Sequence, residues 1–338
     1  MIVIILKLLA GFLLLVGGGD YLVKGGVNIA KRFRVSPLII GMTVVAFGTS
    51  APELLVTLNA SIAGNAGIGV GNVIGSNIVN IALILGLTAL ILPIPVNPNS
   101  IYRDWPVMML ASVLFWIAAI DGYISRVEGI TGFLAMIGFV LYSIKKERIQ
   151  PDVSIGQADG LDDAEKQEDK EEWSLGFSIL MVIGSCAGLA VGADLLVDSA
   201  SVIASKFGVS DRIIGVTIVA FGTSLPELMT SLMAAIKKEM DISVGNIIGS
   251  NIFNILSVIG LSSIISPITI NYPDYFKDFI WMIAVALLLL IVVMPWRLFL
   301  KSGQKSIKSI VRFNGGLITR FSGLVMIVVY CVYIYLLF

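Results

Sequence analysis

Apolar stretches, separated by short segments that contain polar residues, Gly or Pro, run through most of the chain. A helix that crosses a bilayer needs about 20 predominantly apolar residues, and most of these stretches reach that length. We interpret the first stretch as a membrane helix, because it lacks the basic start and small-residue cleavage site of a signal peptide. The pattern predicts ten membrane helices near residues 2–23, 35–62, 67–92, 106–121, 126–145, 174–200, 209–236, 241–268, 275–297 and 316–338.

One segment differs in kind from the rest. Between Gln150 and Trp173 the chain is polar, acidic and poor in apolar residues, which is typical of a solvated linker. This linker, residues 151–173, divides the chain into two five-helix halves, residues 1–150 and 174–338.

The two halves share one long stretch of similar sequence. Residues 41–86 align with residues 215–260 without a gap at an offset of 174, and 26 of the 46 positions are identical. The same offset pairs Asp20 with Asp194. The chain is therefore an internal duplication.

The number of helices in each half determines the orientation of the copies. Because five is odd, the second half must enter the membrane from the opposite face, which predicts an inverted repeat of the kind found in secondary transporters. Alternate loops also differ in charge, and those on one side carry 18 of the 23 Lys and Arg residues. By the positive-inside rule this side, which includes the linker, is cytoplasmic, and both termini lie outside. We expect a multi-pass protein of the plasma membrane, or of the inner membrane in a prokaryote.

Composition narrows the function further. The 338 residues are 57% hydrophobic and only 14% charged, with zero net charge, which excludes a soluble enzyme and a nucleic-acid binder. The chain contains no His, so a His-dependent triad or zinc protease is also excluded. We expect no enzyme activity and no cofactor.

Each half places one Glu in the middle of an apolar stretch. An ionised carboxylate at that depth costs at least a few kcal/mol, so it needs a partner or a wet cavity. Glu53 and Glu227 follow Pro in the motifs GTSAPE and GTSLPE, and no Lys or Arg lies within 15 positions of Glu53. Pro removes a backbone donor and opens the helix locally. Carboxylates, freed carbonyls and the hydroxyls that precede each Glu predict a cation site, to which these motifs contribute Thr49, Ser50, Thr223 and Ser224.

A second polar cluster follows in the motifs GNVIGSNIVN and GNIIGSNIFN. Their glycines, spaced i,i+4, predict the close approach of another helix. Ser and Asn at i,i+4 face one way and supply oxygen ligands, namely Ser76, Asn80, Ser250 and Asn254. For the other amides we predict interhelical hydrogen bonds or caps in preference to ligation: Asn72, Asn77, Asn246 and Asn251.

An all-oxygen site favours a hard cation such as Na⁺ or Ca²⁺ over zinc or copper. Two carboxylates carry a charge of −2, which one Ca²⁺ or two Na⁺ would neutralise. The same site could therefore hold either load but not both, which is what exchange requires.

The two motif pairs resemble the calcium/cation antiporter superfamily, specifically its sodium/calcium exchangers. The resemblance implies an all-α membrane protein of two inverted five-helix repeats that exchanges Na⁺ for Ca²⁺ by alternating access. We expect these ions and the lipid bilayer as its partners, and a monomer. It implies Glu53 and Glu227 as central Ca²⁺ ligands and adds the backbone carbonyls of Ala46 and Ala220 to the hydroxyls and amides above. Some members, including the K⁺-dependent branch, have Asp where this chain has Asn254. The resemblance is therefore to the K⁺-independent branch.

Three alternatives remain open at this point. A Ca²⁺/H⁺ exchanger could use the same two carboxylates, since an apolar site can raise their pKa. An ion channel is compatible with the duplicated motifs. An intramembrane hydrolase would need a nucleophile and a base, and the apolar stretches offer neither His nor Lys. Asp20 and Asp194, which follow Gly-rich runs, are predicted to be caps or gate residues.

Overall fold

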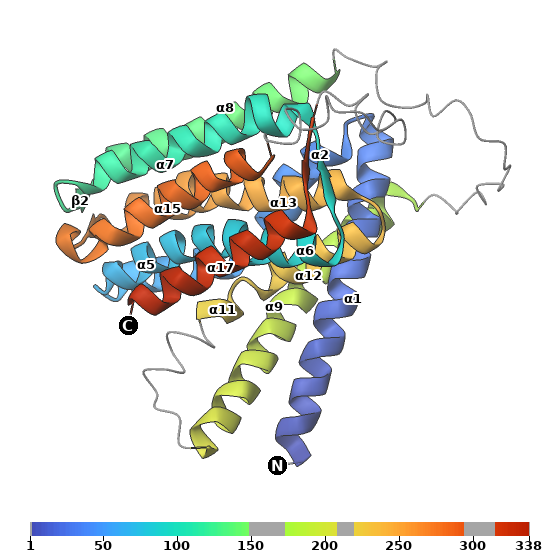
Figure 1. Ribbon diagram of the computed structural model, residues 1–338, viewed down its shortest axis with the longest axis horizontal. Helices are drawn as coiled ribbons and strands as arrows, with labels where there is room; N and C mark the ends of the chain where they lie inside the picture. Colours follow the sequence, from blue (N-terminus) through green and yellow to red (C-terminus); the bar gives the residue numbers. More distant parts are fainter. Residues whose placement is uncertain (1, 149–172, 208–219, 294–314, 338) are drawn as a thin grey trace, which may run out of the picture.

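The computed structural model describes residues 2–148, 173–207, 220–293 and 315–337, and these residues form a helical bundle (Figure 1). Seven of their helices are long and apolar enough to cross a membrane, or eight if the bent pair Pro37–Thr49 and Ala51–Ile62 counts as one span. The other two apolar stretches hold the shorter helices Leu225–Ile236 and Arg320–Leu336. The predicted helical membrane fold is confirmed, whereas the count of ten spans is not.

The first half of the chain begins with one long helix and continues through shorter, partly π-helical segments. Its elements are α1 (Ile2–Phe33), α2 (Pro37–Ile40), η1 (Gly41–Val45), α3 (Ala46–Thr49), α4 (Ala51–Ile62), α5 (Ala66–Ile78), η2 (Val79–Leu85), α6 (Gly86–Ile91), β1 (Ile94–Val96), η3 (Ser100–Asp104), α7 (Trp105–Ala119), β2 (Tyr123–Ile124) and α8 (Arg126–Arg148).

The second half repeats this order. Its elements are α9 (Leu175–Lys206), α11 (Ala220–Gly222), α12 (Leu225–Ile236), α13 (Met240–Phe253), η5 (Asn254–Ile259), α14 (Gly260–Ile265), β3 (Ile268–Thr269), α15 (Tyr272–Val293), β4 (Gly316–Ile318) and α17 (Arg320–Leu337). The ends of α4 and α12, and those of α6 and α14, correspond at the offset of 174. Two predicted features lie outside the described residues: the linker except for Trp173, and the first five residues of the repeat 215–260.

The equivalent helices α1 and α9 run antiparallel. Gly25 of α1 lies against Ser178 of α9, and Gly11 lies against Gly192, so the residue number rises along one helix as it falls along the other. In Figure 1 these two helices run steeply across the remaining ones. Equivalent helices with opposite directions are what an inverted repeat requires.

The helices that carry the second motif form the centre of the molecule. Within the spans Ala66–Ile91 and Met240–Ile265, 72% and 83% of the residues in the most apolar window are buried, compared with 22% in the α1 span. Because lipid does not drive apolar side chains inward, the outer helices can expose Leu, Ile and Phe. The central helices are buried on nearly all sides, so their polar residues face protein.

Two short antiparallel strand pairs, which the hydrophobic pattern did not predict, join the halves. β1 pairs with β4 through Ile94 and Ile318, and β3 pairs with β2 through Ile268 and Ile124. Ile94 and Ile268 are equivalent at the offset of 174, and all four side chains are buried. Each pair therefore connects one repeat to the other.

Candidate functional site

The two Pro-containing motifs interrupt their helices, as predicted. α3 ends before Ser50, whose φ of −87° and ψ of 7° are not helical, and α4 begins at the next residue with Pro52 in its first turn. The segments before and after this break are inclined by 46°. Ser224 has the same conformation before α12, with φ of −92° and ψ of 6°. Each Glu therefore lies in the first turn of a new helix, where the helix dipole favours a negative charge.

Glu53 and Glu227 are completely buried. In the part of the chain that the structure describes, no Lys or Arg forms an ion pair with either one. Hydroxyl groups contact them instead: Ser76 Oγ lies 3.5 Å from Glu53 Oε1, and Ser250 Oγ lies 3.4 Å from Glu227 Oε1.

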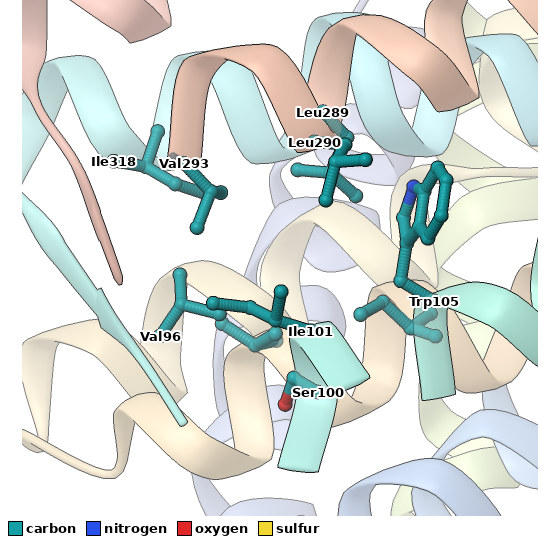
Figure 2. A pocket seen from close by; sticks show the side chains of 10 residues that line it. Val96, Ser100, Ile101, Trp105, Leu289, Leu290, Val293 and Ile318 are labelled. Atoms are coloured by element: carbon teal, nitrogen blue, oxygen red, sulfur yellow. The ribbon is translucent and has the colours of Figure 1, made fainter. Parts of the chain in front are cut away.

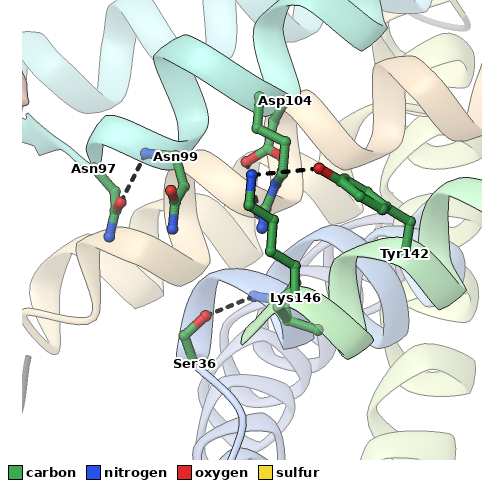
Figure 3. Close-up of polar contacts among 8 residues, drawn as sticks. Ser36, Asn97, Asn99, Asp104, Tyr142 and Lys146 are labelled. Carbon is green, nitrogen blue, oxygen red and sulfur yellow. Dashed lines mark hydrogen bonds and ion pairs between the residues drawn. The ribbon is translucent and has the colours of Figure 1, made fainter. Parts of the chain in front are cut away.

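Asp104, another buried acid, has a basic residue as its partner. Asp104 is fully buried, but Arg103 beside it donates to both of its carboxylate oxygens, from Nε at 2.5 Å and from a terminal nitrogen at 3.2 Å (Figure 3). Buried charges in proteins are usually paired in this way. The two glutamates therefore lack a partner that this fold supplies to another buried acid.

Contacts between the repeats bring the two Glu motifs together. Ser50 from the first motif donates to Glu227 Oε1 at 2.9 Å. Thr49 donates to Asn246 Oδ1 at 3.1 Å, and its Oγ1 lies 3.4 Å from Ser250 Oγ. The site is therefore built from both repeats at once.

The four amides predicted to form interhelical bonds do so. Asn72 Nδ2 lies 3.4 Å from the Glu53 carbonyl, and Asn246 Nδ2 lies 3.4 Å from that of Glu227. Asn77 and Asn251 donate to each other's backbone carbonyls, at 3.4 Å and 3.3 Å. These bonds fix α5 against α4, α13 against α12, and the two central helices against each other.

The nitrogens of the remaining two amides, Asn80 and Asn254, bond to the opposite repeat. Asn80 Nδ2 donates to Asn251 Oδ1 at 3.0 Å, and Asn254 Nδ2 donates to Asn77 Oδ1 at 3.3 Å. Each side-chain oxygen has no hydrogen-bond partner among the described residues, and both residues are fully buried. Each amide is therefore held by an amide of the opposite repeat.

Four buried carboxylate and amide oxygens of the predicted ligands have no donor among the described residues: Glu53 Oε2, Glu227 Oε2, Asn80 Oδ1 and Asn254 Oδ1. A buried acceptor without a donor costs about 1–3 kcal/mol, so such atoms are rare in proteins. A set that contains only oxygen, and no nitrogen or sulfur, matches the ligand preference of Na⁺ and Ca²⁺.

The other predicted ligands are placed as follows. Thr223 is half-buried, and Ser224 is buried with an Oγ that has no partner in the described part of the chain. The Ala46 carbonyl already accepts the Ser50 N–H and lies 3.3 Å from Thr49 Oγ1. Ala220 is the first residue of α11.

Two residues at the site were missed in the sequence. Met108 Sδ lies 3.6 Å from Asn251 Nδ2, and Met282 Sδ lies 3.9 Å from Asn77 Nδ2. The two methionines are separated by 174 residues, so the repeat offset, extended beyond the two motifs, would have found them.

A small apolar hollow lies elsewhere, between β1, η3, α13 and α15 (Figure 2). Its lining includes Val96, Ile101, Trp105 and Leu289, and Ser100 supplies its one polar side chain other than the Trp105 indole. None of the glutamates or site amides reaches it. It offers no oxygen set for a cation.

Comparison with known proteins finds a family model and several relatives that are similar to most of this chain. The family model for the sodium/calcium exchanger protein matches residues 3–145 and 177–338. The sodium/calcium exchanger MaX1 of Methanosarcina acetivorans is 33% identical over 363 residues, which cover 98% of each chain. The putative antiporter CaxA of Alkalimonas amylolytica is 40% identical over 299 residues, covering 86% of this chain and 90% of that protein.

Solved structures are similar as well. The sodium-calcium exchanger NCX_Mj, soaked with 2.5 mM Na⁺ and 0.1 mM Ca²⁺, superposes with a TM-score of 0.78 at 32% sequence identity. The match covers 99% of this chain and 98% of that one. Further structures of the same exchanger, soaked with Na⁺ and Sr²⁺, match with similar scores.

Proposed function

The chain belongs to the sodium/calcium exchanger protein family, and from this membership we propose that it is an antiporter that exchanges Na⁺ for Ca²⁺ across the membrane by alternating access. The observation that carries the proposal is that four buried oxygens, contributed by Glu53, Glu227, Asn80 and Asn254, have no donor among the described residues. We infer a transporter and not an enzyme, because these groups are suited to holding a cation and the proteins of this family that the chain resembles are named exchangers and antiporters.

We propose the two carboxylates and the two amide oxygens as the central ligands of Ca²⁺. The surrounding hydroxyls and backbone carbonyls would complete this shell and provide places for Na⁺: Thr49, Ser50, Ser76, Thr223, Ser224, Ser250, Ala46 and Ala220. Because Ser50 already reaches across to Glu227, a cation held there would draw both repeats together. Binding would thus be coupled to the packing of the two halves.

The charge of the site explains why Ca²⁺ and Na⁺ should not occupy it at the same time. Two carboxylates carry −2, which one Ca²⁺ or two Na⁺ neutralise, while the amides of Asn80 and Asn254 add no charge. Binding both loads together would leave an excess positive charge in a buried, low-dielectric site, which is strongly unfavourable. Exchange then follows if the site opens to one face at a time.

We also propose the arrangement in the membrane. The distribution of Lys and Arg places the loops between the halves and between α12 and α13 on the cytoplasmic side, with both termini outside. In this arrangement residues 1–150 and 174–338 are the two inverted repeats, and residues 151–173 are a cytoplasmic linker.

Flux measurements in proteoliposomes test the function. Vesicles loaded with Na⁺ and diluted into Na⁺-free medium should take up ⁴⁵Ca²⁺, and vesicles with only an imposed pH gradient should not. Uptake driven by the pH gradient alone would instead identify a Ca²⁺/H⁺ exchanger. Uptake that needs no counter-ion and does not saturate would identify a channel.

Two matched variants test the site. Glu53→Gln and Glu227→Gln each remove one negative charge while keeping the size of the side chain, so each should lower Ca²⁺ uptake by roughly tenfold or more. Glu239→Gln is the control, since Glu239 lies at the α12–α13 turn outside the site. Near-normal uptake by both site variants would refute the ligand assignment without affecting the family membership.

A further inference from the structure

The two repeats are nearly symmetric at the cation site but differ where the long helices contact the bundle. At the offset of 174, Asp20 corresponds to Asp194, Lys24 corresponds to Asp198, and Lys237 corresponds to Ala63. One side of the molecule therefore has an acid with two bases. At the equivalent positions the other side has two acids and Ala63.

On the first side the three charges form one ion-pair network. Asp20 Oδ2 lies 2.7 Å from Lys24 Nζ on the same helix. Asp20 Oδ1 lies 2.5 Å from Lys237 Nζ, at the end of α12. The side chains of Asp20 and Lys237 are each only 23% exposed, so water screens this pair less than it would a fully exposed one.

The backbone of α1 beside the ion pairs also lies close to α12. A Cβ atom at Gly19 would lie 3.1 Å from the Met229 carbonyl oxygen and 3.1 Å from Met233 Cγ. The absence of a side chain at Gly19 thus lets α1 lie directly on α12. α12 is also the helix that carries Glu227, so the network links the outer helix α1 to the helix that holds a proposed ligand.

On the opposite side the equivalent connection is missing. Asp194 and Asp198 are exposed, and neither has an ion-pair partner among the described residues. Ala63, in the turn after α4, has no charge to offer. Among the described residues, an ion pair therefore joins the outer helix to the end of its neighbouring Glu-bearing helix at one face only.

We propose that the ion pair between Asp20 and Lys237 is a one-sided latch, which holds α1 against the α12–α13 turn and favours the conformation in which that face is closed. The inference rests on the proposed alternating access, and the charge distribution identifies the latched face as the cytoplasmic one. Opening this face by separating α1 from α12 breaks the pair, whereas opening the other face leaves it intact. The latch thus biases the cation-free protein towards exposure of its site to the outside.

Sided measurements of apparent Ca²⁺ affinity test the latch. Lys237→Gln and Asp20→Asn should each raise the apparent affinity at the cytoplasmic face by about threefold to fivefold, the size expected of a partly exposed pair, with a smaller decrease at the outer face. The double variant should add little to either single one, because both remove the same pair. Lys237→Arg should behave like the parent protein.

Two further variants sharpen the test. Lys238→Gln removes the neighbouring Lys, for which the structure gives no ion pair, and should leave both affinities unchanged. Ala63→Lys introduces a base at the position equivalent to Lys237, in the repeat arrangement that carries Asp194 and Asp198, and should shift the two affinities in the reverse direction. Equal changes at both faces, or none, in Lys237→Gln and Asp20→Asn would overturn the proposal.

Hydrogen exchange provides a readout that does not need transport. In buffer without Na⁺ or Ca²⁺, amides of residues 20–33 and of the α12–α13 turn should exchange faster in Lys237→Gln than in the parent protein or in Lys238→Gln. Unchanged exchange would overturn the latch. Absence of Ca²⁺ flux in the parent protein would contradict the proposed function but would leave this result standing.

Discussion

Asn80 and Asn254 show how neighbouring side chains can leave the oxygen of a buried amide as the atom without a partner. A free amide could point either its nitrogen or its oxygen at a site. Here each nitrogen donates to an amide oxygen from the opposite repeat, Asn251 or Asn77, so that the oxygen is the atom left over. Asn251 and Asn77 thus fix the orientation of the Asn80 and Asn254 amides.

Asn254→Asp should change the cation preference. The new carboxylate adds a third negative charge to the site, which favours the divalent ion over Na⁺. It also cannot donate to Asn77 Oδ1, so the cation-free protein should lose roughly 1–2 kcal/mol of stability. Competition of Na⁺ against ⁴⁵Ca²⁺ binding, together with thermal unfolding with and without Ca²⁺, measures both effects.

Asn80→Asp is the matched variant, because its amide makes the equivalent bond to Asn251. It should shift the preference in the same direction. An unchanged Na⁺-to-Ca²⁺ selectivity in Asn254→Asp would remove Asn254 from the ligand shell.

At the scale of elements, the site lies where helices deviate from regular α-helical geometry. α3 and α4 are separated at Ser50, and the central helix changes to the π-helical segment η2 one residue before Asn80. In the second repeat η5 begins at Asn254. π-helical turns often occur at functional sites, because they change the direction in which the following side chains point.

Close backbone contact between elements brings the repeats together at this point. A Cβ atom at Gly249 of α13 would lie 2.5 Å from Met42 Cα in η1 and 2.7 Å from the Met42 carbonyl oxygen. A Cβ at Gly245 would lie 2.7 Å from the Leu38 carbonyl oxygen. Gly245 and Gly249 thus permit the predicted close approach of another helical segment. The same prediction is wrong for the first repeat, where a Cβ at Gly75 would meet no described atom within 4 Å and one at Gly71 would meet only the Tyr275 ring, at 3.6 Å.

Gly249→Ala should therefore destabilise the protein and reduce transport. Because backbone atoms occupy the space, η1 and α13 must move apart, at a cost of about 1–3 kcal/mol. This movement would also separate Thr49 from Asn246. Thermal unfolding in detergent and Ca²⁺ uptake measure the two effects.

Gly138→Ala is the control on α8, where a new Cβ would meet no described atom within 4 Å. It should leave transport intact and, through helix propensity, leave stability equal or higher by up to about 1 kcal/mol. A Gly249→Ala protein as stable and active as Gly138→Ala would contradict the packing argument.

At the scale of the whole molecule, the inverted repeat places equivalent turns at opposite faces. The turn after α4 and the turn after α12 contain Gly64 and Lys238, separated by 174 residues, and both have a positive φ, of 78° and 64°. Their conformations are thus alike although their sequences differ. In the proposed topology these two turns lie on opposite sides of the membrane.

Cysteine labelling tests this arrangement. In a background without Cys186 and Cys331, a membrane-impermeant maleimide should label Ala63→Cys in intact cells. It should label Lys238→Cys only after the membrane is opened. Labelling of both positions from the same side would contradict the inverted topology and also the assignment of the latched face.

Much of the fold could be predicted from the sequence because the signals are local or periodic. Apolar runs predict helices wherever they are long enough, the offset of 174 reveals the duplication, and an odd number of helices in each half implies inversion. Glu53 and Glu227 could be identified as site candidates because a charge in an apolar run is costly at any place in a membrane fold. The break at Ser50 followed from Pro52, whose effect on a helix is also local.

Other features depended on which surfaces meet in space, and no pattern along the chain contains that information. Ser50 donates to Glu227 across 177 positions, and Asn77 and Asn251 exchange hydrogen bonds across 174. The strands were missed because two or three residues are too few to show a period, and they form only by pairing with a distant partner. Asp20 could be recognised as duplicated but not as paired with Lys237, since that contact exists only because the inverted packing lays α1 on the end of α12.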